Sequence, residues 1–147
     1  MQGLSNQLEH KIQKAQNSCI RFSFGLRKYD HITKCRLSNN IISMQGRRLL
    51  HCFTLMFKIV RQIAPIYLCD RITYKCQLHN YNTRCKNDIQ TPFARTRSRT
   101  LSFFIDIAKK YNELSHHFDA SGISTATFKM KCKKNLLSNQ QNFLNLT

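Results

Sequence analysis

The chain has 147 residues, with 24 Lys and Arg against 7 Asp and Glu, and a formal net charge of +17 with neutral histidines. Its mean hydropathy is −0.44, and no apolar run approaches the ~20 residues that a bilayer-crossing helix needs, so we expect no membrane span. Such an excess of positive charge repels itself, which favours a polyanionic partner: nucleic acid is the first expectation, and an anionic membrane surface is the alternative.

The first predicted helix starts near residue 4 and stops at Gly25. Its apolar positions recur at spacings of four and three: Leu4, Leu8, Ile12, Ala15, Cys19 and Phe22. Lys11, Gln13, Lys14 and Gln16 are expected on its solvent side. Residues 27–43 show no clear period and hold several basic side chains, so we predict a long irregular link there.

The strongest amphipathic pattern predicts a helix over residues 44–63, with Ser43 as its N-cap. Its apolar stripe is Leu49, Phe53, Met56, Val60 and Ile63, widened by Leu50 and Phe57. Pro65 either ends this helix or opens a short one through residues 66–68. Residues 73–98 have no period and are rich in polar and basic residues, which predicts a second long irregular link.

Two further helices are predicted before the C-terminus. One covers residues 100–118, with an apolar face at Leu101, Phe104, Ile105, Ala108, Tyr111, Leu114 and Phe118. The last helix follows Ser124, which is its predicted N-cap, and a disordered tail is expected over residues 139–147. The predicted fold is therefore mainly α: about four helices with long irregular links, in one helical segment over residues 1–147 that need not close its own core.

Basic residues of the second link are the candidate nucleic-acid contacts. We predict that phosphates are bound by Lys75, Arg84, Lys86, Arg95, Arg97 and Arg99. Tyr81 is the candidate for stacking on a base. The alternative for each of these residues is an ordinary solvated loop side chain. Together, with few acidic residues to neutralise them, they favour phosphate contact.

The seven cysteines allow a weaker metal hypothesis. The N-terminus lacks the basic and apolar regions of a signal peptide, so we expect reduced thiols and an intracellular location, in the nucleus or cytoplasm and not secreted. Zinc ligation by Cys76, His79 and Cys85 is a minor alternative, because structural zinc sites usually begin with a C-x2–4-C pair and the chain has no CxxC. The main expectation is no metal and no cofactor.

No catalytic constellation is evident in the sequence. Two-metal phosphoryl transfer needs clustered carboxylates, whereas the aspartates here are widely scattered. Neither a phosphate-binding GxxxxGK[ST] loop nor a GxGxxG motif is present. We therefore expect no enzymatic activity from this chain alone.

Five stretches carry a resemblance to a known family. The first runs Gln16-Asn17-Ser18-Cys19-Ile20-Arg21-Phe22 and on through residues 24–33, and Arg47-Arg48-Leu49 with residues 55–60 follows. Residues 64–68 come next. The fourth and most distinctive stretch is His79-Asn80-Tyr81-Asn82-Thr83-Arg84. Residues 128–129 and 133–137 form the last stretch. In this order and spacing the chain resembles the C-terminal, thumb-distal region of jockey-like non-LTR retrotransposon reverse transcriptases, which are RNA-directed DNA polymerases.

The chain departs from the family pattern at one motif and in its lack of tryptophan. The Trp-Asn-x-Leu-Pro element of the family reads Tyr111-Asn112-Glu113-Leu114-Ser115 here, and the chain has no tryptophan, which indicates a diverged or truncated copy. In the family the catalytic aspartates lie upstream in the palm, so no catalytic residue is carried onto this chain. The resemblance implies RNA or DNA handling by helical basic surfaces, and a polymerase core as the missing packing partner.

Two alternatives remain beside this hypothesis of a non-catalytic, nucleic-acid-binding fragment. The chain is either a partly folded retroelement relic without a selected activity, or a small zinc-dependent nucleic-acid-binding module. An uncooperative melt would favour the relic, and stoichiometric zinc would favour the module.

Overall fold

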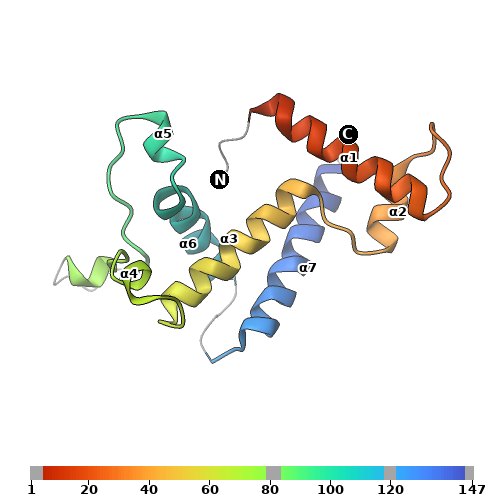
Figure 1. Cartoon of the computed structure of the whole chain (residues 1–147). Coiled ribbons are helices and arrows are strands. Elements are labelled where there is room, and N and C mark those ends of the chain that lie inside the picture. Colours follow the sequence, from red (N-terminus) through yellow and green to blue (C-terminus); the bar gives the residue numbers. More distant parts are fainter. Residues whose placement is uncertain (1–4, 79–83, 118–121, 145–147) are drawn as a thin grey trace. The chain divides into compact units, whose positions relative to one another are not determined.

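The computed structural model describes residues 5–78, 84–117 and 122–144. Within these ranges the chain is mainly helical, as predicted, but it is divided into more helices than the sequence indicates (Figure 1). The longer elements are α1 (Asn6–Ser23), α2 (Ile32–Ser38), α3 (Met44–Val60), α6 (Ala108–His117) and α7 (Thr125–Leu144). The short ones are α4 (Ile66–Cys69), the 3₁₀ turn η1 (Lys75–Gln77), α5 (Arg97–Thr100) and the π-helical turn η2 (Phe103–Ile107).

Contacts divide the chain into two compact units, which we describe separately. Unit 1 comprises residues 52–128, and unit 2 comprises residues 5–51 and 129–144 of the described chain. No helix in the described part is both long and apolar enough to cross a membrane.

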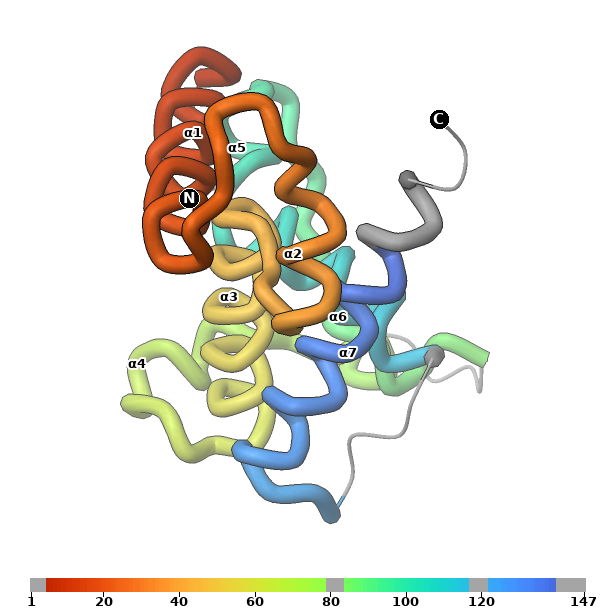
Figure 2. Tube along the Cα trace, turned by 90° about the vertical axis from the view of Figure 1, so that its right-hand side faces the viewer, coloured from red at the N-terminus to blue at the C-terminus, as the bar shows by residue number. Residues whose placement is uncertain are grey.

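In unit 2, α1 and α2 contact each other across the turn that joins them (Figure 2). The Ser5 hydroxyl caps α1 by accepting from the Leu8 N–H, and Gly25 after the helix has a φ of +61°, where glycine carries no steric penalty. The prediction of an irregular link over residues 27–43 is wrong, because α2 occupies its middle. Ile32 is the buried residue of this short helix, and one buried residue gives no apolar period that could be recognised in the sequence.

The buried face of α1 differs from the predicted one. Ile20 is buried, whereas Leu8 is 46% exposed and Phe22 is 91% exposed. The glutamines expected in solvent instead hold the segment before α3: Gln16 Nε2 donates to the Ile42 carbonyl at 2.9 Å, and Gln13 Oε1 accepts from the Met44 N–H at 3.1 Å. Two glutamine hydrogen bonds therefore join this helix to the segment before α3, while Leu8 and Phe22 remain exposed.

The predicted caps of α3 and α7 are both confirmed. Ser43 Oγ accepts from the Gly46 N–H at 3.1 Å, and Ser124 Oγ accepts from the Thr127 N–H at 3.2 Å. The α3 helix ends at Val60, however, and Gln62 has a φ of +57°. Ile63 therefore leaves the predicted stripe and is 65% exposed.

An aromatic cluster forms the centre of unit 1. The rings of Phe57 and Phe128 stack with centroids 4.2 Å apart, and the Tyr111 ring lies 6.2 Å from that of Phe128. Both phenylalanines are 1% exposed. The face predicted for residues 100–118 is confirmed at four buried positions that η2 and α6 supply: Ile105, Ala108, Tyr111 and Leu114. Phe118 lies outside the described residues.

The C-terminal part of α7 belongs to unit 2. Cys132 on this helix is 1% exposed, and burial raises the pKa of its thiol to about 12. The helix continues to Leu144, whereas the sequence predicts a disordered tail from residue 139. Its last turns contain Ser and Asn, whose short polar side chains compete with backbone hydrogen bonds and so make a helix hard to predict there.

Candidate functional site

The link over residues 73–98 is irregular for most of its length, but its backbone is paired. Tyr74 and Ile89 form an isolated antiparallel pair, flanked by hydrogen bonds from the Gln90 N–H to the Thr73 carbonyl (2.7 Å) and from the Lys75 N–H to the Asp88 carbonyl (3.0 Å). The two short turns η1 and α5 also interrupt the predicted irregularity. The backbone of the link is therefore held by hydrogen bonds over much of its described part.

The side-chain amide of Asn112 joins this segment to α6. Asn112 Oδ1 accepts from the Ile89 N–H at 3.0 Å, and Asn112 Nδ2 donates to the Ile89 carbonyl at 2.9 Å. His116 lies one helical turn further along α6, on the same face as Asn112. The amide therefore brings the segment around Asp88 to the side of the helix that carries His116.

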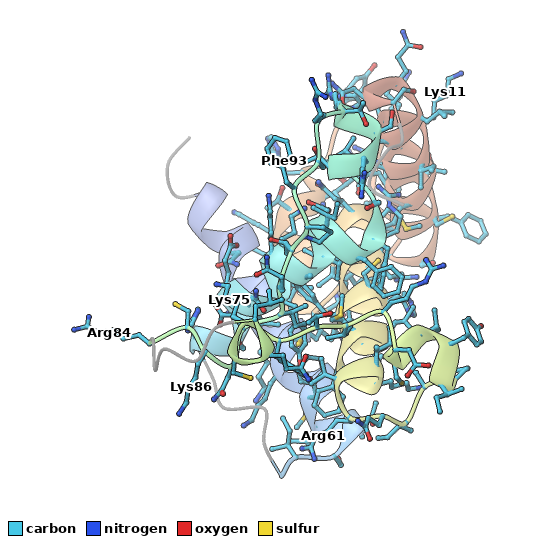
Figure 3. The ribbon with its side chains drawn as sticks, turned by 90° about the vertical axis from the view of Figure 1, so that its left-hand side faces the viewer. Lys11, Arg61, Lys75, Arg84, Lys86 and Phe93 are labelled. Atoms are coloured by element: carbon cyan, nitrogen blue, oxygen red, sulfur yellow. The ribbon has the colours of Figure 1, made fainter. Side chains whose placement is uncertain are left out.

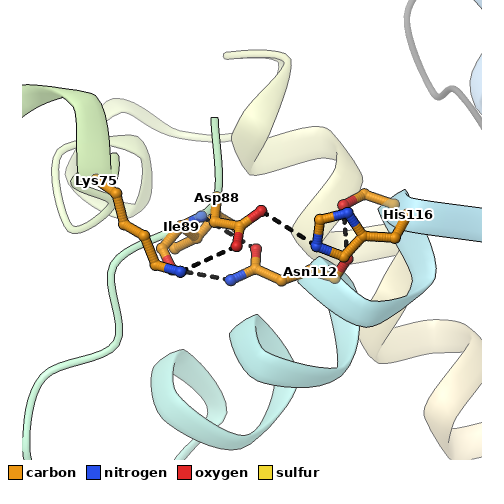
Figure 4. A network of polar contacts seen from close by, with 6 residues as sticks. Lys75, Asp88, Ile89, Asn112 and His116 are labelled. Carbon is orange, nitrogen blue, oxygen red and sulfur yellow. Dashed lines mark hydrogen bonds and ion pairs between the residues drawn. The ribbon is translucent and has the colours of Figure 1, made fainter. Parts of the chain in front are cut away.

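Asp88 is the centre of a polar cluster in unit 1 (Figure 4). It is 8% exposed, and its Oδ2 accepts from Lys75 Nζ at 3.0 Å. Its Oδ1 lies 3.5 Å from His116 Nε2. The cluster borders an open cavity of about 520 Å³, whose lining also includes Arg61, Arg84 and Tyr74. Burial raises the pKa of the Tyr74 hydroxyl, with the nearby Cys76 and Cys69 thiols adding to this effect, so Tyr74 remains a neutral part of the wall.

The structure divides the predicted phosphate ligands into two groups. Lys75 is half-buried and paired with Asp88. The other five are exposed: Arg84, Lys86, Arg95, Arg97 and Arg99. Figure 3 shows the Arg84 and Lys86 side chains extending away from the ribbon. Within the described chain, none of these five has a carboxylate at ion-pairing distance.

The three arginines of the series share one short stretch. The Thr96 side chain caps α5 by accepting from the Arg99 N–H at 3.3 Å, so the backbone between Arg95 and Arg99 is turned rather than extended. Residues two apart on a helix do not face the same way, and Arg97 and Arg99 therefore present their charges in different directions.

Sequence reasoning missed one exposed aromatic side chain here. Phe93 is 84% exposed and stands two residues before Arg95. The signal available in the sequence was Pro92 before it, which disfavours helix, and the run of basic residues after it. Tyr81, the predicted stacking residue, lies outside the described residues, as do His79, Asn80, Asn82 and Thr83 of the family motif.

Of the predicted zinc ligands, Cys76 and Cys85 are described, and both are exposed. Cys85 lies close to Asp88 and His116, a combination without a CxxC pair. The detectable signal was the spacing Cys85-x-x-Asp88, which places two ligand-type residues at the ends of one turn.

Comparison with family models, curated proteins and solved structures finds no match to this chain.

Proposed function

We propose that the chain is a non-catalytic segment that binds RNA or DNA electrostatically through the link between α4 and η2. The supporting observation is the set of five exposed cations between residues 84 and 99, in a chain of net charge +17. Each contact with a phosphate would release a condensed counterion, which favours binding at low salt. The exposed Phe93 ring beside these cations supplies an apolar face on which a base of a single strand can stack.

The resemblance to the C-terminal region of non-LTR reverse transcriptases supports the same proposal. A segment of that origin would handle template or product beside a polymerase core. The exposed Leu8 and Phe22 side chains of α1 favour such an origin, because a helix that packs on a larger protein keeps an apolar face for it. This chain would then bind nucleic acid without performing the polymerase reaction.

The test is the affinity for a fluorescent single-stranded RNA of mixed sequence, measured by anisotropy across a range of salt concentrations. The variant R95Q/R97Q/R99Q removes three charges, and R95K/R97K/R99K is the matched control that retains them. The glutamine variant is expected to bind more weakly and to reduce the slope of log K against log salt by about 2, since each single-strand contact contributes about 0.7. The lysine variant should keep a slope close to that of the wild type. Equal slopes for the wild type and the glutamine variant would contradict the assignment.

Phe93→Ala in the same assay separates stacking from charge. Loss of stacking on one base costs about 1–3 kcal/mol at every salt concentration and leaves the slope unchanged. Phe93→Tyr, which keeps a ring, is expected to retain the affinity. If Phe93→Ala binds as tightly as the wild type, the ring has no part in binding.

A further inference from the structure

We propose that Cys85, Asp88 and His116 form a binding site for a divalent transition-metal ion, zinc being the best fit. One ligand atom from each residue, a thiol sulfur, a carboxylate oxygen and an imidazole nitrogen, lies within 4.8 Å of the other two. This set differs from the one that the sequence indicates, which shares only Cys85 with it. The site goes beyond the proposed nucleic-acid binding and does not depend on it.

The backbone holds two of the three ligands on one turn. The Asp88 N–H donates to the Cys85 carbonyl at 3.1 Å, which closes a turn with two residues between the ligands. Hydrogen bonds from the Lys75 N–H to the Asp88 carbonyl (3.0 Å) and from the Cys76 N–H to the Lys86 carbonyl (2.9 Å) fix this turn against the neighbouring segment. A two-residue spacing is also the shortest that pairs of zinc ligands commonly use.

The third ligand comes from α6. The two hydrogen bonds between Asn112 and Ile89 fasten the residue next to Asp88 to this helix. His116 then follows Asn112 by one turn, which places its ring beside the carboxylate (Figure 4). The arrangement of all three ligands is therefore set by backbone pairing and one amide, without a metal ion.

The distance between two of the ligand atoms matches a shared ion. Asp88 Oδ1 and His116 Nε2 are 3.5 Å apart. Two such atoms bound to one tetrahedral zinc, each at ~2.1 Å, are separated by about 3.4 Å. A direct charge-assisted hydrogen bond between them would be shorter, at about 2.7–2.9 Å. The separation of 3.5 Å therefore fits a shared ion, and it also lies within the range of a direct ion pair between the two side chains.

The surroundings of Asp88 suit a ligand role. Lys75 Nζ lies 3.0 Å from Oδ2, the oxygen that does not face His116. This ion pair orients the carboxylate and leaves Oδ1 for the metal, as partners of metal-binding carboxylates commonly do. Since Asp88 is only 8% exposed, a cation beside it would also compensate a charge that is largely removed from water.

The chemistry of the ligands selects the class of ion. A thiolate and an imidazole are softer ligands than Mg²⁺ or Ca²⁺ prefers, and both are common ligands of zinc. Asp88 and His116 also line the 520 Å³ cavity, so a fourth coordination position would face open space. Three protein ligands with one open position are typical of zinc sites that keep a water molecule or bind an external ligand.

The first test is a Co²⁺ titration of the reduced full chain, followed by competition with Zn²⁺. We expect one equivalent to give the visible absorption of four-coordinate Co²⁺ with a thiolate ligand, and Zn²⁺ to displace it. C85S and H116Q should each weaken binding by at least about tenfold. The matched controls C76S and H51Q should bind as the wild type does, with far-ultraviolet circular dichroism confirming that each variant folds.

The competing ligand set is tested in the same titration with H79Q. If H79Q and C76S lose the metal while H116Q retains it, the ions are bound by Cys76, His79 and Cys85, and the proposal is wrong. Absence of a stoichiometric complex, or equal binding by C85S and the wild type, would also overturn it.

Thiol alkylation supplies a second measurement on the unmodified chain. Zn²⁺ should slow the alkylation of Cys85 at least about tenfold, mapped by mass spectrometry, while the exposed Cys19 and Cys76 react as before. Cys132 is the internal reference, because its burial makes it slow to react with or without metal. Equal protection of all exposed cysteines would indicate non-specific binding and contradict the site.

Discussion

Two regions of unit 1 are held together by different physical means. In the aromatic cluster, the Phe57 and Phe128 rings are both 1% exposed and stack 4.2 Å apart. The polar cluster around Asp88 depends on a few directional bonds, of which the Asn112 amide makes two, and it borders a cavity that Phe57 and Tyr111 also line. Apolar packing sums many small contacts, whereas a polar clamp can fail with one side chain. The comparison indicates that stability and site geometry can be altered separately.

The largest effect is expected for Phe128→Ala. Removing a fully buried ring and leaving a cavity costs about 3–5 kcal/mol of unfolding free energy, which urea denaturation measures. Phe93→Ala is the matched control: the same atoms are removed from a side chain that is 84% exposed, and we expect a change within about 0.5 kcal/mol. Similar losses for the two variants would show that the aromatic cluster is not the core of unit 1.

Asn112→Ala should have an intermediate effect on stability. The change leaves both the N–H and the carbonyl of Ile89, a buried residue, without their partners, which costs about 1–3 kcal/mol. Asn139→Ala is the control on α7, because that side chain is exposed and donates to the side chain of Asn135 at 3.2 Å rather than to a buried backbone group. Both substitutions raise helix propensity equally, so the difference in urea midpoint isolates the clamp. No difference would mean that the link over residues 73–98 is not fastened through Asn112.

Lys75→Met should have the smallest effect. Its ammonium pairs with Asp88, but the lysine side chain is 38% exposed, so we expect a loss of about 0.5–1 kcal/mol in low salt. Because salt screens such a pair, the loss should shrink in 1 M NaCl. Lys86→Met, an exposed neighbour, is the control and should not change stability measurably. A loss that is equally large in high salt would assign the role of Lys75 to packing rather than to charge.

The sequence could predict the features of the fold that depend on local signals. The helices with a repeated apolar period were predicted correctly in class, and Ser43 and Ser124 were identified as their caps, because these signals are local. On α1, two glutamine side chains form hydrogen bonds to the segment before α3, and an apolar period in the sequence does not predict such bonds. The α2 helix was missed because one buried isoleucine gives no period.

The candidate site was harder to predict than the helices. The exposed arginines of residues 95–99 were named from charge alone, since charged side chains of a link face solvent by default. His116 lies 28 or more positions from Cys85 and Asp88 in the sequence, yet the fold places the three side chains close together. This proximity depends on the Asn112 amide and the Tyr74–Ile89 pair. Sequence spacing could indicate the first two ligands, but only the folded chain brings in the third.

The measurement that tests the central claim most directly is the salt dependence of the affinity of the intact chain for single-stranded RNA. Electrostatic binding through residues 84–99 predicts a straight line of log K against log salt with a slope of about −2 or steeper, because three or more phosphate contacts each contribute about −0.7. A slope of zero, or no binding at low salt, would contradict the account.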